Sequence, residues 1–245
     1  MSSISVVMPV FNEAPTIEQQ VRSVLAILRP QDELIVVNGE STDDTAQCLH
    51  TLVQKSAPSP HRLSVLCTRK GRAHQMNMGA RQASNEVLLF LHADTTVSRQ
   101  AWDQLTQLAQ NTQAGVRYWG RFDVRLHGRS KGLPMVAGFM NWRSRLTHIC
   151  TGDQGIFITR NLFQCIGGYF EQPLMEDIEL CTTLKAQPDA HYLPLQGPVV
   201  SSGRRWDSHG LWPTIWLMWR FRFAYWRGAS AYDLARKYAD VRHRS

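Results

Sequence analysis

Short apolar runs alternate with segments of helical periodicity four times in the first hundred residues, and this alternation restricts the fold more than any other feature. Runs of this kind are typical of strands buried on both faces of a sheet, and they cover residues 4–10, 33–37, 63–67 and 87–91. The pattern predicts an α/β fold, in which a mostly parallel, Rossmann-like central sheet is flanked by helices. A TIM barrel needs about eight such units, and this alternation ends after Asp94.

The chain after Asp94 is less regular. We expect a strand or hairpin over 116–126, a helix over 135–146, a short strand over 155–159, a helix from Met175, a loop around Pro194 and Pro198, and a helical tail over 211–238. Four tryptophans lie in that tail. We predict a main domain over residues 1–205 and a helical C-terminal extension over 206–245, packed on that domain or on a membrane surface.

The bulk properties suggest where the protein works. Its five cysteines are odd in number and form no CxxC pair, which favours a reducing compartment over a disulfide framework or a structural zinc site. The N-terminus enters a strand-like run at once, with no secretory signal, and no apolar stretch is long enough to span a bilayer. We therefore expect a cytoplasmic protein, with the inner face of the cell membrane as a site of association.

The formal charge of +7 indicates an anionic partner: nucleic acid, an anionic membrane or a phosphorylated small molecule. Arginines and aromatic residues alternate in the tail, over residues 212–227. Such a stretch could stack on bases, lie on anionic lipid, or pack on the protein with some arginines exposed. These three interpretations stay open on composition alone.

Asp94 follows the apolar run 88–91, at the position where open α/β sheets bind their ligands. One hypothesis is that Asp94 holds Mg²⁺ or Mn²⁺ against a diphosphate, with His92 as a second ligand that favours Mn²⁺. The alternative is that Asp94 caps the following helix, because Asp is a preferred N-cap residue.

Two further groups suit the same chemistry. Arg72 opens a helix and could bind phosphates together with the helix N-terminus. The adjacent acids Glu176 and Asp177 also begin a helix; Asp177 could act as a general base while Glu176 contacts substrate. The alternative is a solvated helix start, where acids are common because of the helix dipole.

Several stretches together resemble the family-2 glycosyltransferases, which have a GT-A fold. They are 5–13 (SVVMPVFNE), 36–45 (VVNGESTDDT), 71–79 (GRAHQMNMG), 91–94 (LHAD), 167–169 (GGY) and 175–177 (MED), and the likeness runs to about Leu184. The LHAD, TGDQ, LMED and SGRRW segments are similar to those of a bacterial glycosyltransferase 2-like subfamily. His92 stands where the family has the first aspartate of Asp-x-Asp.

The resemblance implies an inverting transfer of a hexosyl or related sugar from a nucleotide-diphospho-sugar, with a UDP-sugar favoured, to a hydroxyl acceptor. It implies catalytic roles for Asp177 and Glu176 and metal binding by Asp94 and His92. The residues implied in nucleotide-sugar binding are Pro9, Asn12, Glu13, Asn38, Arg72, Ala93, Asp94, Arg204 and Arg205. Those implied on the acceptor side are Asp153 and Trp206.

Two other classes of protein share some of these features. A nucleotidyltransferase usually carries a Gly-rich basic loop after the first strand, whereas residues 11–15 here are acidic and contain no glycine. A basic binding module without catalysis would use the positive charge and the aromatic tail, either on nucleic acid or on a membrane. We expect no nucleic-acid partner and a peripheral contact with an anionic membrane.

Overall fold

A computed structural model describes residues 3–56, 62–113 and 115–243 of the 245-residue chain. The strands are β1 (Ile4–Val10), β2 (Glu33–Asn38), β3 (Arg62–Cys67), β4 (Val87–Phe90), β5 (Thr95–Val97), β6 (Arg117–His127), β7 (Ile156–Thr159), β8 (Ala190–Tyr192) and β9 (Leu195–Ser202). The helices are α1 (Ile17–Leu25), α2 (Thr45–Ser56), α3 (Arg72–Gln82), α4 (Arg99–Asn111), α5 (Leu133–Thr147), the 3₁₀ helix η1 (Gly152–Gln154), α6 (Arg160–Cys165), α7 (Glu176–Lys185), α8 (Arg204–His209), α9 (Leu211–Trp226) and α10 (Ala231–His243).

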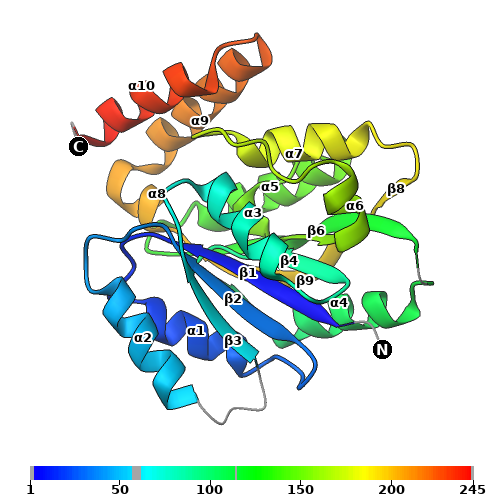
Figure 1. The fold of residues 1–245 in the computed structure, drawn as a ribbon. Helices are drawn as coiled ribbons and strands as arrows, with labels where there is room; N and C mark the ends of the chain where they lie inside the picture. Colours follow the sequence, from blue (N-terminus) through cyan, green and yellow to red (C-terminus); the bar gives the residue numbers. More distant parts are fainter. Residues whose placement is uncertain (1–2, 57–61, 114, 244–245) are drawn as a thin grey trace.

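The strands of these described residues form one sheet in the order β3-β2-β1-β4-β7-β6-β9-β5, with β8 paired to β6 (Figure 1). β1 is parallel to both β2 and β4, and β2 is parallel to β3. β7 runs antiparallel to both β4 and β6. The predicted α/β architecture with a mostly parallel sheet is confirmed.

The apolar strands face a hydrophobic core on each side, because helices cover both faces of the sheet. On one face, Val6 and Leu89 belong to a core that also contains side chains of α1 and α2. On the other face, Val7 and Leu88 pack in a second core with α3 and α7. Every residue of β4 is buried, which confirms the interpretation of that run as a two-faced strand.

The second half of the chain differs from the prediction at its strands. Residues 117–127 form one long strand, β6, so the stretch expected to be a strand or a hairpin is a strand. The expected loop around Pro194 and Pro198 is wrong in part, because β9 runs parallel to β6 through Pro198. The register of this pair shifts between Phe122 and Asp123, and such irregularities are where a sheet tolerates proline.

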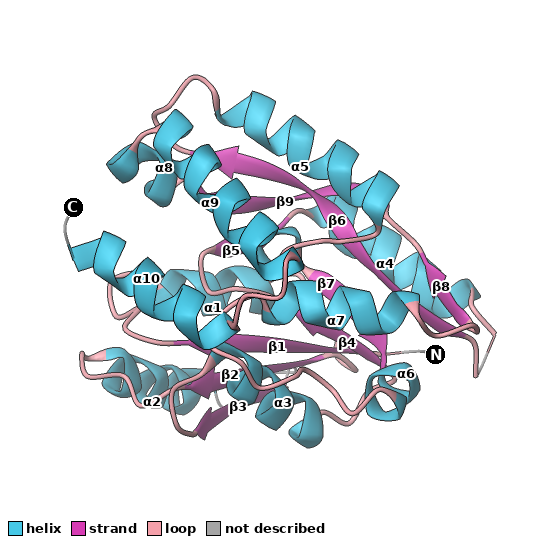
Figure 2. Ribbon diagram, turned by 90° about the horizontal axis from the view of Figure 1, so that it is seen from above, coloured by secondary structure: helices cyan, strands magenta, loops and turns pink. Residues whose placement is uncertain are grey.

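The helical tail predicted over 211–238 is confirmed: α9 and α10 cover it, and the short helix α8 precedes it. Gly228, with φ of 90°, separates α9 from α10. Leu211, Ile215 and Met218 of α9 pack against the first core, so α9 lies against the body of the protein (Figure 2). Within the described ranges, no helix combines the length and the apolar character needed to cross a membrane.

Candidate functional site

Asp94 lies in the turn between β4 and β5 and does not begin a helix. The next helix, α4, starts at Arg99, and its N-cap is Ser98, whose hydroxyl accepts a hydrogen bond from the amide of Ala101 at 3.1 Å. The interpretation of Asp94 as a helix cap is therefore wrong. Its side chain stays available for a ligand at the carboxyl end of β4.

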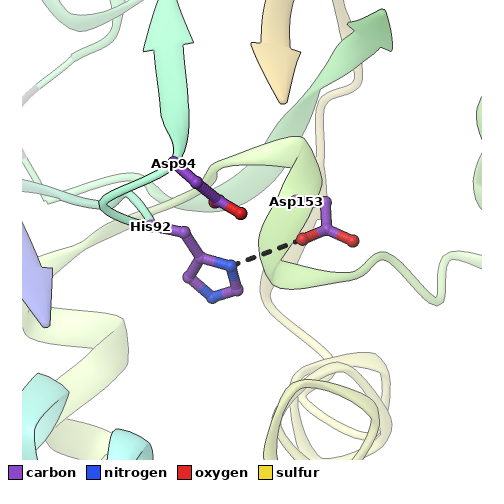
Figure 3. A group of neighbouring side chains, drawn as sticks. All are labelled: His92, Asp94 and Asp153. Carbon is purple, nitrogen blue, oxygen red and sulfur yellow. Dashed lines mark ion pairs between the residues drawn. The ribbon is translucent and has the colours of Figure 1, made fainter. Parts of the chain in front are cut away.

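His92, Asp94 and Asp153 offer donor atoms that all lie within 4.8 Å of one another. In Figure 3 the three side chains converge from the turn after β4 and from η1, and the dashed line joins His92 Nδ1 to Asp153 Oδ1 at 3.5 Å. One imidazole and two carboxylates could hold Mn²⁺ or Mg²⁺ and leave coordination positions for phosphate oxygens. Asp153, which the sequence placed on the acceptor side, lies beside the two residues predicted as metal ligands.

Gly152 permits this approach because it has no side chain. A Cβ at this position would lie 2.1 Å from two ring atoms of His92. η1 is closed by a capping box between Thr151 and Gln154, and the Gln154 amide donates to Ser144 of α5 at 3.1 Å. The segment that carries Asp153 is thus fixed at both ends.

Glu176 is buried at the start of α7 and Asp177 is half-buried, so the alternative of a solvated helix start is wrong. Glu176 is only 3% exposed, and its carboxylate pairs with Nη1 of Arg72 at 3.1 Å. Asp177 Oδ2 accepts a hydrogen bond from the amide of Gly152 at 3.2 Å. The predicted base therefore touches the same 3₁₀ helix that carries Asp153.

The pKa of Asp177 lies above its ordinary value of 3.8. Burial is the main cause, and the charge of Glu176 adds to it, while Arg222, Arg72 and the Gly152 amide act in the opposite direction. A carboxylate with a raised pKa is a stronger proton acceptor, which suits a general base.

The loops after β1 and β2 are tied together where the nucleoside pocket was expected. Asn12 adopts a left-handed conformation with φ of 54°, and its side-chain oxygen accepts the amide of Thr42 at 2.8 Å. Asn38 is 3% exposed, and its amide oxygen accepts the Ser41 hydroxyl at 2.6 Å. Pro9 is buried in β1. Hydrogen bonds within the protein already occupy the Asn38 oxygen that could accept from a base.

The remaining predicted residues lie in different surroundings. Arg204 is largely exposed and lies 3.7 Å from Oε2 of Glu13, and Ala93 is buried between the two predicted metal ligands. Trp206 is 7% exposed and belongs to the first core, so little of its ring can face an acceptor. The side chain of Arg205 lies outside the described part of the structure.

Two arginines that the sequence did not single out also face this site. Arg143 of α5 and Arg222 of α9 both interact electrostatically with Asp177 and with each other. No motif or spacing indicates them, because their approach depends on how α5 and α9 pack. A surface hollow of about 240 Å³, lined by residues such as Glu86, Tyr118 and Asn161, lies at the opposite end of β4 and includes none of the residues above.

A sheet covered on both faces, with polar groups beyond its strand ends, is the arrangement of α/β enzymes that bind ligands at that edge. The sequence profile of the family described as Glycosyl transferase family 2 matches residues 5–167. The chain belongs to this family and has a GT-A-like fold.

Curated relatives match a limited stretch of the chain. The poly-beta-1,6-N-acetyl-D-glucosamine synthases of Staphylococcus epidermidis and Staphylococcus aureus are each 30% identical to it over 101 residues, which is 41% of this chain. That stretch is 24% of each relative, so the chain matches about a quarter of their length.

Solved structures share the fold over most of the chain. A mannosyltransferase from Pyrobaculum calidifontis, in complex with GDP-Man and Mn²⁺, has a TM-score of 0.61 and 22% identity over 90% of this chain and 60% of its own. Residues 1–349 of Staphylococcus aureus TarS, in complex with UDP-GlcNAc, have a TM-score of 0.61 and 17% identity over 83% of this chain and 59% of that one.

Proposed function

We propose that the protein transfers a sugar, with inversion, from a nucleotide-diphospho-sugar to a hydroxyl acceptor and that it depends on a divalent metal. The observation that carries the proposal is the connection between two groups. His92, Asp94 and Asp153 converge as donors for a cation, and the amide next to Asp153 binds the carboxylate of Asp177. A leaving-group site and a proton acceptor are thereby side by side.

In this mechanism Asp177 takes the proton of the acceptor hydroxyl as its oxygen bonds to the anomeric carbon. The bond from that carbon to the diphosphate breaks, and the nucleoside diphosphate leaves with the electron pair. A single displacement of this kind inverts the anomeric centre. Bound at His92, Asp94 and Asp153, Mn²⁺ or Mg²⁺ would neutralise charge on the leaving diphosphate.

The other residues orient the two substrates. Arg72 already pairs with the buried Glu176, so both are held where the diphosphate and the reacting sugar would meet. Pro9, Asn12, Glu13 and Asn38 lie at the ends of β1 and β2, and we assign the nucleoside to this edge. We assign Arg204 and Arg205 to the diphosphate.

We favour a UDP-sugar as donor. The TarS structures were determined with UDP and with UDP-GlcNAc, and the Pyrobaculum mannosyltransferase with GDP-Man and Mn²⁺. A thermal-shift screen of UDP- and GDP-sugars with Mn²⁺ tests the proposal, because a ligand at 100 times its dissociation constant stabilises the folded state by about 2.7 kcal/mol. A rise in melting temperature with one donor class is expected; no shift with any nucleotide-sugar would contradict the proposal.

We also propose that residues 206–245 form an extension of a catalytic domain over 1–205 and that they rest on the inner face of an anionic membrane. Large side chains on α9 are exposed, among them Trp219 and Trp226. Trp219 contacts Phe139 of α5 at 5.8 Å between ring centroids, which joins the exposed aromatic residues of two helices. Neither α5 nor α9 contains an acidic residue, as suits an anionic lipid surface.

A further inference from the structure

Arg143 has two guanidinium nitrogens that are covered by protein and have no hydrogen-bond partner among the described residues. Its Nε and Nη2 atoms are buried and, among the described residues, have no hydrogen-bond acceptor. Buried polar atoms are nearly always paired with protein or with a bound molecule, and leaving them unpaired costs free energy. The unpaired nitrogens of Arg143 therefore indicate a binding position for an anion.

Arg222 approaches the same place from α9. It lies within electrostatic reach of Arg143 and also of Asp177 and Asp153. In the ranges that the structure describes, it makes no ion pair within 4 Å. Burial, and to a lesser extent the charge of Arg222, lower the pKa of Arg143 to about 10.

The nearby acids are engaged by other groups. Arg72 already pairs with Glu176 at 3.1 Å, and a cation at His92, Asp94 and Asp153 would take up the charge of two carboxylates. Asp177 then interacts with both guanidinium groups. An anion between the arginines would supply the acceptor atoms that Nε and Nη2 of Arg143 lack among the described residues.

Helix α5 holds Arg143 in place. Arg121, fully buried on β6, pairs with Asp123 and donates to the backbone oxygen of Asn141 at 3.0 Å. Asn141 in turn accepts the amide of Val124 at 2.9 Å. Since these contacts lie within one turn of Arg143, its guanidinium is presented from a rigid support.

We propose that Arg143 and Arg222 bind an oxyanion group, such as phosphate or carboxylate, on the acceptor substrate. This rests on the proposed function and adds the chemical class of the acceptor. The groups assigned to the donor come from the loops after β1, β2 and β4 and from α3, η1 and α8, whereas these arginines come from α5 and α9 (Figure 2). The bound anion also offsets the effect of Arg222, which favours the ionised form of Asp177, so acceptor binding strengthens the base.

The test is calorimetric titration of inorganic phosphate into the full chain, with and without saturating UDP and Mn²⁺. The variants are Arg143→Gln, Arg222→Gln and the matched control Arg220→Gln, which removes an exposed arginine of the same helix. We expect the wild type to bind phosphate both with and without UDP and Mn²⁺. Phosphate affinity should be at least about tenfold weaker in Arg143→Gln and Arg222→Gln, because each loses a charged hydrogen-bond donor. It should be unchanged in Arg220→Gln.

Equal phosphate affinity in the wild type and in Arg222→Gln would overturn the proposal, and so would complete displacement of phosphate by UDP and Mn²⁺. Arg222 is partly exposed on a surface helix, so its variant keeps the test valid if Arg143→Gln fails to fold. Failure of UDP and Mn²⁺ to bind the wild type would contradict the proposed function instead, which separates the two results.

Discussion

Gly152 shows how one missing side chain can shape the site. Since a Cβ there would overlap the His92 ring, Gly152→Ala must displace His92 from Asp94 and Asp153. We predict Mn²⁺ affinity about 10–100-fold weaker, the range seen when the support of a metal ligand is lost. Titration of Mn²⁺ followed by electron paramagnetic resonance measures it.

Gly138→Ala is the matched control, because a Cβ at that position in α5 meets nothing within 4 Å. It should leave Mn²⁺ affinity unchanged and stabilise the protein by about 0.5–1 kcal/mol, since alanine favours a helix over glycine. Wild-type Mn²⁺ affinity in Gly152→Ala would contradict the placement of His92 in the cation site.

Asp177→Asn tests the base at the same scale. We predict that transfer falls by about 10²–10⁴-fold while donor binding persists. In the wild type, transfer should decline as the pH falls through a pKa above the ordinary 3.8, because only the ionised carboxylate accepts a proton and burial raises its pKa. Retained turnover in Asp177→Asn, measured as release of nucleoside diphosphate, would rule Asp177 out as base.

Residues that follow a recognisable strand or begin a helix could be predicted from the sequence. Asp94 was identified because it ends an apolar run, and Asp177 because it opens a helix. The family resemblance implied a role for Asp153 on the acceptor side. Its position beside His92 could not be predicted, because that contact joins segments about sixty residues apart. Arg143 and Arg222 have no local pattern at all, since only the packing of α5 and α9 brings them to Asp177.

At the scale of elements, helix α9 is attached to α7, the helix that carries the proposed base. The Tyr225 hydroxyl donates to Glu179 Oε2 at 2.6 Å and lies 3.2 Å from the Gln172 amide. Arg222, on the same helix, interacts electrostatically with Asp177. The tail is therefore part of the site's surroundings.

Tyr225→Phe removes that attachment and little else. We predict a loss of about 1.5–3 kcal/mol in the free energy of unfolding, because the hydrogen bond to the Glu179 carboxylate and the one from Gln172 are lost. Amide exchange should become faster in α9. Tyr232→Phe, on the exposed face of α10, is the control and should change neither quantity. Unchanged exchange in α9 would show that this contact does not hold the helix.

Strands that are apolar without interruption were predicted well. Strands that are very short or contain a proline were not. β1, β2 and β4 are mostly apolar without interruption because both sheet faces are covered, so their composition alone indicates them. β5 has only three residues, and β9 contains Pro198, which reads as a loop locally. Both form because they pair with strands that lie far away in the sequence: β5 pairs with β9, and β9 also pairs with β6. Local sequence patterns do not indicate such pairing.

At the scale of the whole molecule, the exposed aromatic residues of α5 and α9 should bind an anionic bilayer. We predict that the chain co-floats with phosphatidylglycerol vesicles and does not co-float with phosphatidylcholine vesicles. Salt should weaken binding to the anionic vesicles, because it screens the charge of the arginines. Trp219→Glu combined with Trp226→Glu should abolish flotation. Phe170→Glu, at an exposed aromatic residue before α7, should not. A wild-type chain that never floats would contradict the membrane contact.

The proposed function depends above all on Asp94 and its neighbours holding a cation against the donor diphosphate. Calorimetric titration of UDP in the presence of Mn²⁺, into the wild type and into Asp94→Ala, measures that role. We expect clear binding to the wild type and loss of most of that affinity in the variant, because the convergent donors His92 and Asp153 alone leave the cation incompletely bound. Equal affinity of UDP and Mn²⁺ for the two proteins would show that Asp94 does not hold the cation.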